Sequence, residues 1–135
     1  MIDIQVTGSA AARFSRREIA AFARKVLAAI DRLDDMNELS IAFVDDTAMQ
    51  SLNRKFRRKN KTTDVLTFPG EDSCEIVISV DQARRQAADE KHGLATEIRY
   101  LLLHGILHGL GYDHEKDHGE MDALEIKVRE KVGLE

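Results

Sequence analysis

The sequence contains few cysteine, proline and aromatic residues, and each shortage excludes a class of protein. The single cysteine, Cys74, cannot form an internal disulfide, so an apolar core in a reducing compartment must hold the chain together. One proline and eight glycines exclude a Pro- or Gly-rich linker. No apolar run approaches the roughly 20 residues of a membrane helix, and the first residues do not resemble a signal peptide. We therefore expect a cytoplasmic protein that does not enter a membrane.

A large excess of one charge is also absent, since 20 Lys and Arg stand against 24 Asp and Glu and the formal net charge is −4. This balance excludes a uniformly basic nucleic-acid-binding protein, so any contact with nucleic acid must come from a local patch. The 135 residues suit a single domain over 1–135 and exclude a separate cofactor lobe. Neither the composition nor the motifs specify an oligomeric state.

The order of periodic segments predicts an α+β fold of layered helices and strands. Apolar runs predict strands at residues 2–7, 38–44, 64–69 and 75–80. The amphipathic segments between and after them predict helices, giving a mixed sheet of about four strands with about five helices. Helix starts are marked by capping residues: Ser15 with Glu18, Asp45 or Asp46, and Asp81. We expect Met49, Leu52 and Phe56 to share one side of the second helix.

A helix that opens at Thr96 and Glu97 is apolar nearly all round, which predicts a helix buried at the centre of the domain. Its apolar residues are Ile98, Leu101, Leu102, Leu103, Ile106 and Leu107. His104 and His108 are four residues apart and therefore lie on one face of this helix. Two imidazoles on a buried, leucine-rich helix are costly unless a partner satisfies them.

A third histidine completes a pattern that favours a metal site. In the sequence HGILHGLGYDH, Gly111 allows the chain to reverse, so that His114 can return toward His104 and His108. Three imidazole nitrogens with an open fourth position are the ligand set of a catalytic zinc. Asp113 either accepts an N–H from one of these imidazoles or is an ordinary turn residue. We predict one Zn²⁺ per chain, in a metal-dependent hydrolase.

The same histidine spacing occurs in the metzincin proteases, which need a glutamate directly after the first histidine as general base. This chain has Gly105 at that position, and glycine cannot accept a proton from water. The alternative of a zinc metallopeptidase would therefore need a base from elsewhere, such as Glu75, Glu97 or Glu115.

A second alternative is a non-catalytic binding module that zinc stabilises. It requires a closed fourth metal position, filled by His118 or Asp117. We expect instead that His118 is exposed near the start of the last helix, because its neighbours are highly polar. His92 lies in a polar segment and is expected to have no role at the metal.

Three blocks of the chain together resemble the YbeY family of bacterial single-strand-specific metallo-endoribonucleases. The histidine motif HGILHGLGYDH resembles the signature of that family. Residues 52–69, LNRKFRRKNKTTDVLTFP, resemble its Leu-Asn…Arg…Thr-Asp-Val-Leu-Ser-Phe-Pro block, and CEIVIS at 74–79 resembles its Gly-Asp-Ile-x-Ile-Ser strand. The blocks follow in the order and spacing of the family, and the resemblance covers most of the chain.

The chain departs from the family pattern at positions other than the three histidines. Thr62 stands in place of Pro, and Thr67 in place of Ser. Cys74-Glu75 replaces Gly-Asp, and Gly109 replaces Leu. Thr67 and Glu75 keep the chemical type, whereas we expect Gly109 to loosen the helix end near the site.

The resemblance implies a function in ribosome maturation. It places zinc on His104, His108 and His114, and implies an endoribonuclease that matures the 3′ end of small-subunit ribosomal RNA and acts in ribosome quality control. The implied partners are single-stranded and ribosomal RNA, the small ribosomal subunit and its assembly proteins. For the non-catalytic alternative, the resemblance implies a module that binds ribosomal RNA or ribosomal proteins. Attack on phosphorus by a zinc-activated water and attack by the RNA 2′-hydroxyl both fit these residues.

A basic stretch offers contacts for RNA phosphates on an otherwise acidic protein. Arg57 matches the functionally important arginine of the family, and we predict that it clamps a phosphate or stabilises the transition state. Arg54, Arg58 and Lys59 are expected to bind the RNA backbone. With five Phe, two Tyr and no Trp, extensive base stacking is not expected, so sequence preference should be weak.

Overall fold

The computed structural model describes residues 2–8, 15–58, 63–113 and 116–134. Its elements in chain order are β1 (Asp3–Thr7), α1 (Arg16–Ala29), a short 3-10 helix (Leu33–Asp35), β2 (Glu38–Val44), α2 (Asp46–Arg57), β3 (Val65–Pro69), β4 (Ser73–Ser79), α3 (Val80–Glu90), α4 (Leu94–Gly109) and α5 (Glu120–Val132). The four strands and five α-helices of these residues confirm the predicted α+β fold.

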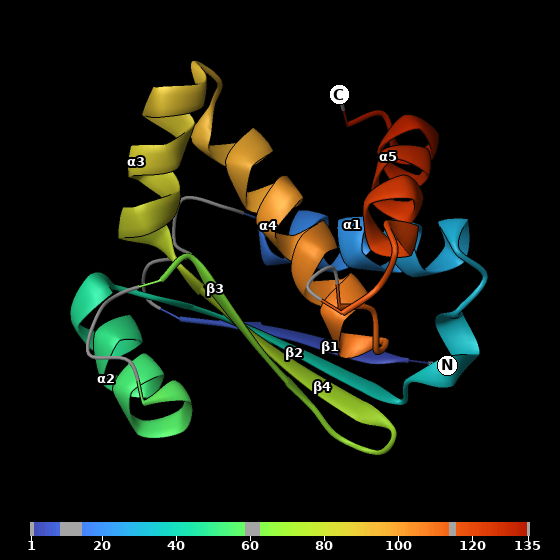
Figure 1. The fold of residues 1–135 in the computed structure, drawn as a ribbon, viewed down its shortest axis with the longest axis horizontal. Coiled ribbons are helices and arrows are strands. Elements are labelled where there is room, and N and C mark those ends of the chain that lie inside the picture. Colours follow the sequence, from blue (N-terminus) through green and yellow to red (C-terminus); the bar gives the residue numbers. More distant parts are fainter. Residues whose placement is uncertain (1, 9–14, 59–62, 114–115, 135) are drawn as a thin grey trace.

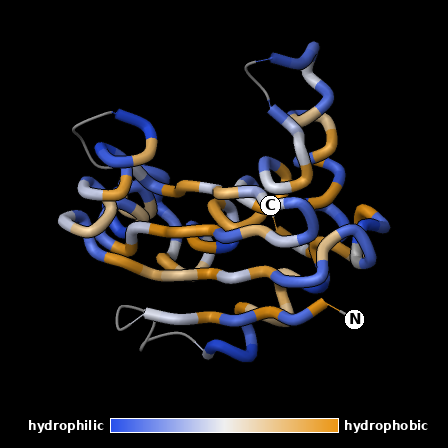
Figure 2. Tube along the Cα trace, turned by 90° about the horizontal axis from the view of Figure 1, so that it is seen from below, coloured by the Kyte–Doolittle hydropathy of each residue, from blue (hydrophilic) through white to orange (hydrophobic). Residues whose placement is uncertain are grey.

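The sheet is mixed, with strand order β1-β2-β4-β3. β1, β2 and β4 are parallel, and β3 pairs antiparallel with β4. Figure 2 shows the strands side by side, with β1 at the edge next to the N-terminus and β3 at the opposite edge. The β3 edge therefore has no further strand within the described residues, and the site described below is built around it.

Helices cover the two faces of the sheet unequally. Figure 1 shows α1, α3, α4 and α5 on one face and α2 on the other. The main core lies between the sheet and the larger helical layer and includes Ile41, Ile76 and Leu103. A smaller cluster of Met49, Leu66 and Val77 lies under α2. This arrangement leaves part of the sheet face beyond α2 open.

α4 is the buried central helix that the sequence predicts. Leu103, Ile106 and Leu107 are fully buried along it. Gly105 allows this helix to approach the sheet closely, because a Cβ atom added there would lie 3.0 Å from Cγ2 of Ile76. None of the described helices combines the length and the apolar character needed to cross a bilayer.

The predicted helix caps are right in two cases and wrong in one. The Ser15 side chain accepts a hydrogen bond from the Glu18 amide, and Asp45 caps α2 by accepting from the Ala48 amide. α3 is capped by Ser79 rather than by Asp81, because β4 runs directly into this helix and its last residue occupies the cap position. Asp81 lies in the first turn of α3 and accepts from the Asp46 amide.

Candidate active site

The histidine pair of α4 brings two ring nitrogens together. Nε2 of His104 lies 3.1 Å from Nε2 of His108, and the ring centroids are 4.6 Å apart at an interplanar angle of 78°. The i, i+4 spacing places both rings on one helix face, and the burial of the opposite faces of α4 fixes that face toward the β3 edge. The two nitrogens therefore converge on a common point.

This pair opens into a cleft of about 540 Å³ at the β3 edge. α4 contributes His104 and His108, and α2 contributes Asn53 and Arg57 from the other face of the sheet. Residues 63–67 of the edge strand and its approach lie between these two helices and line the cleft floor. The cleft thus combines imidazole nitrogens, a guanidinium group and the carboxylate of Asp64.

The chain after α4 turns back toward the cleft, as the sequence predicts. Gly111 has φ +101°, a left-handed conformation that favours glycine, and its amide donates to the carbonyl of His108. The Tyr112 amide donates to the carbonyl of Leu107, which completes a Schellman motif. Tyr112 and Asp113 then line the same cleft as the histidines. His114 follows directly in sequence and lies outside the described residues.

The donor set fits a zinc ion. Two imidazole nitrogens bound about 2.0–2.1 Å from a tetrahedral zinc would be about 3.3 Å apart. The separation of 3.1 Å between the two Nε2 atoms is close to this value. Residues 2–8, 15–58, 63–113 and 116–134 contain no group of three potential metal ligands. His114, the third ligand predicted from the sequence, follows Asp113 and lies outside these residues.

Glu125 is a site residue that the sequence reasoning missed. Its Oε1 atom lies 3.7 Å from Nδ1 of His104, on the ring edge opposite the cleft. Hydrogen bonding to Glu125 raises the pKa of His104, and burial opposes this effect. A signal for it was present, because Glu125 lies on the same face of α5 as buried Met121 and Val128, where an apolar residue is expected.

The end of α2 places the basic residues at the cleft mouth. Arg54 and Arg57 lie in the last turn, and Arg58 ends the helix in a left-handed conformation at φ 58°. All three side chains are exposed, and Arg57 lines the cleft wall facing the histidines. Lys59 lies outside the described residues. Phe56, between these cations, shares the apolar side of α2 but is 54% exposed.

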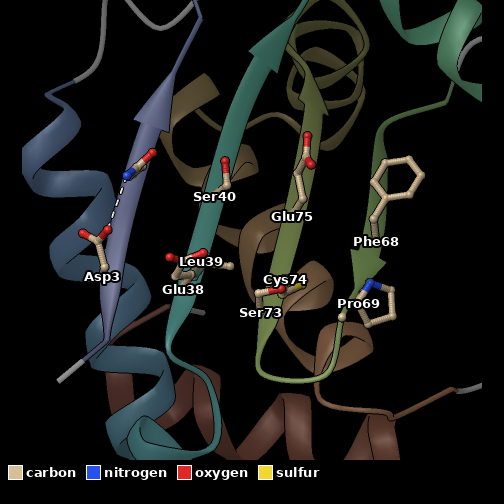
Figure 3. Close-up of a pocket in the computed structure, with 11 residues that line it drawn as sticks. Asp3, Glu38, Leu39, Ser40, Phe68, Pro69, Ser73, Cys74 and Glu75 are labelled. Atoms are coloured by element: carbon tan, nitrogen blue, oxygen red, sulfur yellow. Dashed lines mark hydrogen bonds between the residues drawn. The ribbon is translucent and has the colours of Figure 1, made fainter.

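The two candidate peptidase bases that the structure describes, Glu75 and Glu97, lie away from the cleft. Glu75 lines a separate hollow of about 270 Å³ on the open sheet face, and Figure 3 shows it beside Ser40 of the neighbouring strand, with the main helical layer behind the sheet. Glu97 is buried against α3, where its carboxylate is 2.6 Å from Nε2 of His92 and accepts from Gln86. Glu115 lies outside the described residues. Neither of these two glutamates is therefore placed to act as a general base at the histidine pair.

Asp117 and His118, the residues predicted to close the fourth metal position in a non-catalytic module, both have other surroundings. The carboxylate of Asp117 accepts hydrogen bonds from the amides of Gly119 and Met121 and so orders the start of α5. His118 is exposed, as predicted. His92 stacks on Tyr100 at a centroid distance of 5.5 Å and bonds to Glu97, away from the histidine cleft.

These features define an α+β protein whose histidine pair faces an arginine across an edge strand. The family model described as Endoribonuclease YbeY matches residues 5–133, and the chain belongs to the YbeY family. Endoribonuclease YbeY of Nautilia profundicola is 42% identical over 116 residues, covering 78% of this chain and 84% of the relative. The protein of the same name from Solibacter usitatus is 40% identical over 127 residues, covering 93% and 84%.

A solved structure agrees with this assignment at the level of the fold. The solution structure of TM1509 from Thermotoga maritima superposes with a TM-score of 0.66 at 26% identity. The match covers 98% of this chain and 89% of the other. The α+β architecture and the family are therefore established together.

Proposed function

We propose that the chain is a zinc-dependent endoribonuclease that cuts single-stranded RNA in the cleft at the β3 edge. The observation that carries this proposal is the convergence of His104 Nε2 and His108 Nε2, 3.1 Å apart, in a cleft that Arg57 also lines. The Endoribonuclease YbeY name of the family and of its relatives is consistent with this chemistry, a hydrolysis or transesterification of RNA.

His104, His108 and His114 would hold the zinc ion. When bound there, it would supply a Lewis acid that polarises a phosphoryl oxygen. The protein itself fixes the ligands: the Thr67 hydroxyl donates to the carbonyl of Gly105 at 3.3 Å and ties β3 to α4 beside His104. Glu125 faces Nδ1 of His104 and so directs Nε2 of the same ring into the cleft.

Arg57 would bind the RNA phosphate from the opposite wall. A guanidinium group can donate two parallel hydrogen bonds to two phosphate oxygens, which fixes the phosphate as well as neutralising it. Arg54 and Arg58 add positive charge at the same end of α2. Asp64 and Asp113 supply the carboxylates of the described cleft, either of which can take a proton from the attacking group.

The test separates metal binding from catalysis in four proteins: the wild type, His108→Ala, Arg57→Ala and Arg84→Ala. Arg84 is an exposed arginine on α3, outside the cleft lining, and serves as the matched control. Zinc is measured by elemental analysis, and cleavage by the rate of cutting of a labelled single-stranded RNA. We expect about one zinc per chain in the wild type and its loss, with cleavage, in His108→Ala.

Arg57→Ala should keep its zinc and lose about 10²–10³-fold in cleavage rate, the cost of removing one group that stabilises transition-state charge. Arg84→Ala should match the wild type in both measurements. Full zinc content in His108→Ala would exclude the histidine site. Equal cleavage by all four proteins would show that a contaminating nuclease does the cutting.

The proposed substrate in the cell is the 3′ end of small-subunit ribosomal RNA, cut on precursor small subunits in the cytoplasm as part of ribosome maturation and quality control. The buried free thiol of Cys74 fits the reducing conditions of that compartment. Purified precursor subunits should be cut at the mature 3′ end by the wild type and not by Arg57→Ala. Cleavage of free RNA without any cleavage of precursor subunits would overturn this cellular assignment while leaving the nuclease intact.

A further inference from the structure

Phe56 is an aromatic ring in an unusual setting on α2. Among the described residues, Phe56 and Ile126 are the two large apolar side chains that are more than half exposed, at 54% and 52%. Single exposed apolar residues are common and need no explanation by themselves. Phe56 differs from Ile126 in what surrounds it and in what holds it.

The ring of Phe56 is held in place by a neighbouring aromatic ring. Phe68 of β3 contacts it edge-on, with centroids 5.2 Å apart and an interplanar angle of 70°. Figure 3 shows Phe68 at the β3 edge of the sheet. Because Phe68 also packs with the small core under α2, this contact anchors the exposed ring to the body of the protein.

The surroundings of Phe56 are strongly basic. Lys55 and Arg57 adjoin it in sequence, and Arg54 and Arg58 lie within two residues on the same helix end. The Nζ atom of Lys55 is 5.4 Å from the ring centroid. A rigid exposed ring among four cations is complementary to a polyanion that carries flat apolar groups, which describes a single-stranded nucleic acid.

Phe56 lies between the histidine cleft and the hollow on the open sheet face. Its neighbour Arg57 lines the histidine cleft, whereas its contact partner Phe68 lines the hollow on the open sheet face. That hollow carries the carboxylates of Asp3, Glu38 and Glu75, which repel phosphate. A strand bound at Phe56 is therefore directed toward Arg57 and the histidines rather than across the sheet.

We propose that Phe56 is a base-stacking subsite, which binds one unpaired base of the RNA next to the phosphate held by Arg57. This inference rests on the proposed nuclease function. It also gives a physical reason why the nuclease would prefer single-stranded RNA to a duplex. A base in a duplex has both faces covered by its neighbours, so only an unstacked base can lie against the ring. Stacking on an aromatic ring tolerates every base, so the subsite selects single strands without reading sequence.

The test uses a fluorescein-labelled 12-nucleotide 2′-O-methyl RNA, checked for integrity on a gel, and zinc-loaded wild type, Phe56→Ala and Ile126→Ala. Affinity is measured by fluorescence anisotropy for the intact strand and for strands in which one base at a time is replaced by an abasic nucleotide. We expect Phe56→Ala to weaken binding of the intact strand about tenfold. Ile126→Ala, which loses an equally exposed apolar side chain, should bind as the wild type does.

The abasic strands distinguish stacking from a structural effect. At one position, removal of the base should weaken binding to the wild type about tenfold and should not weaken binding to Phe56→Ala any further. If Phe56→Ala binds the intact strand as well as the wild type does, the subsite is excluded. It is also excluded if Phe56→Ala weakens the intact and every abasic strand equally, since that result indicates a general loss of fold or charge.

A fluorescent variant provides an independent readout. The chain contains no tryptophan, so Phe56→Trp introduces a single indole at the subsite. Unlabelled single-stranded RNA should quench its fluorescence to saturation, and a blunt duplex of the same sequence should not. Equal quenching by both would overturn the subsite. Failure of the wild type to bind any single strand would instead overturn the proposed nuclease function, and the subsite with it.

Discussion

Gly109 and Cys74 occupy a shared space between α4 and β4. A Cβ atom added to Gly109 would lie 2.5 Å from Sγ of Cys74, far inside van der Waals contact. The buried Cys74 side chain therefore fills the space that a side chain at position 109 would need. Gly109 is accordingly the last residue of α4, packed against the sheet.

This relationship predicts strong coupling in a double-mutant cycle. Gly109→Ala should lower the free energy of unfolding by about 1–3 kcal/mol, because the buried Sγ atom must move. In a Cys74→Ala background the same substitution should cost much less, since the Cβ atom of residue 74 is at an ordinary 3.5 Å. Urea unfolding of the four proteins measures the coupling. Additive costs would show that the two positions do not share space.

The Cys74 thiol should be unreactive in the native protein. Burial, and then the charge of Glu75, raise its pKa from 9.0 to about 11. Because the pKa is raised on folding, the neutral thiol stabilises the fold below about pH 9, and this contribution is lost as pH rises through about 11. Iodoacetamide at pH 8 should label Cys74 slowly in buffer and fast in urea. Equal rates in the two conditions would contradict a buried thiol.

Gly105→Ala should destabilise the protein although alanine favours helices. Its Cβ atom would lie 3.0 Å from Cγ2 of Ile76 and 3.3 Å from the hydroxyl oxygen of Thr67. We expect a net loss of about 1–3 kcal/mol in the free energy of unfolding, since overpacking outweighs the helix gain of about 0.5–1 kcal/mol. Gly93→Ala is the control, because nothing lies within 4 Å of its added Cβ atom. A Gly105→Ala protein as stable as the wild type would show that α4 can move away from the sheet.

Glu125→Gln should weaken zinc binding without unfolding the protein. A carboxylate beside the remote nitrogen of a ligand imidazole orients the ring, and its loss typically costs about 10–100-fold in metal affinity. Competition with a chromophoric chelator measures this affinity. Glu130→Gln, at an exposed position on the same helix, is the control. Unchanged zinc affinity in Glu125→Gln would show that Glu125 has no part in positioning His104.

Local patterns were sufficient to predict most helices and strands. Ser15 and Asp45 cap the helices that follow them because an N-cap depends on residues within one turn. The prediction of Asp81 as a cap is wrong because β4 and α3 are continuous, so that a strand residue, Ser79, caps the helix. The strand order β1-β2-β4-β3 depends on contacts between distant segments and had no signal in any local window.

In the candidate site, too, the features set by local sequence were predictable and those set by tertiary packing were not. The spacing of His104 and His108 and the glycine at 111 fix the geometry locally, so the sequence predicts the convergence of nitrogens and the chain reversal. Glu125 comes from another helix and reaches His104 only through the packing of α5. The exposure of Phe56 likewise depends on where α2 ends relative to β3, a tertiary relationship that helical periodicity does not contain.

The most direct measurement of the central claim is the position of zinc in crystals of the zinc-loaded protein, located by anomalous scattering at the zinc edge. We predict one peak about 2.0–2.1 Å from Nε2 of His104, Nε2 of His108 and a ring nitrogen of His114, with its fourth position open toward Arg57. A peak elsewhere, or one whose fourth position is closed by Asp117 or His118, would contradict the account of a catalytic metal in this cleft.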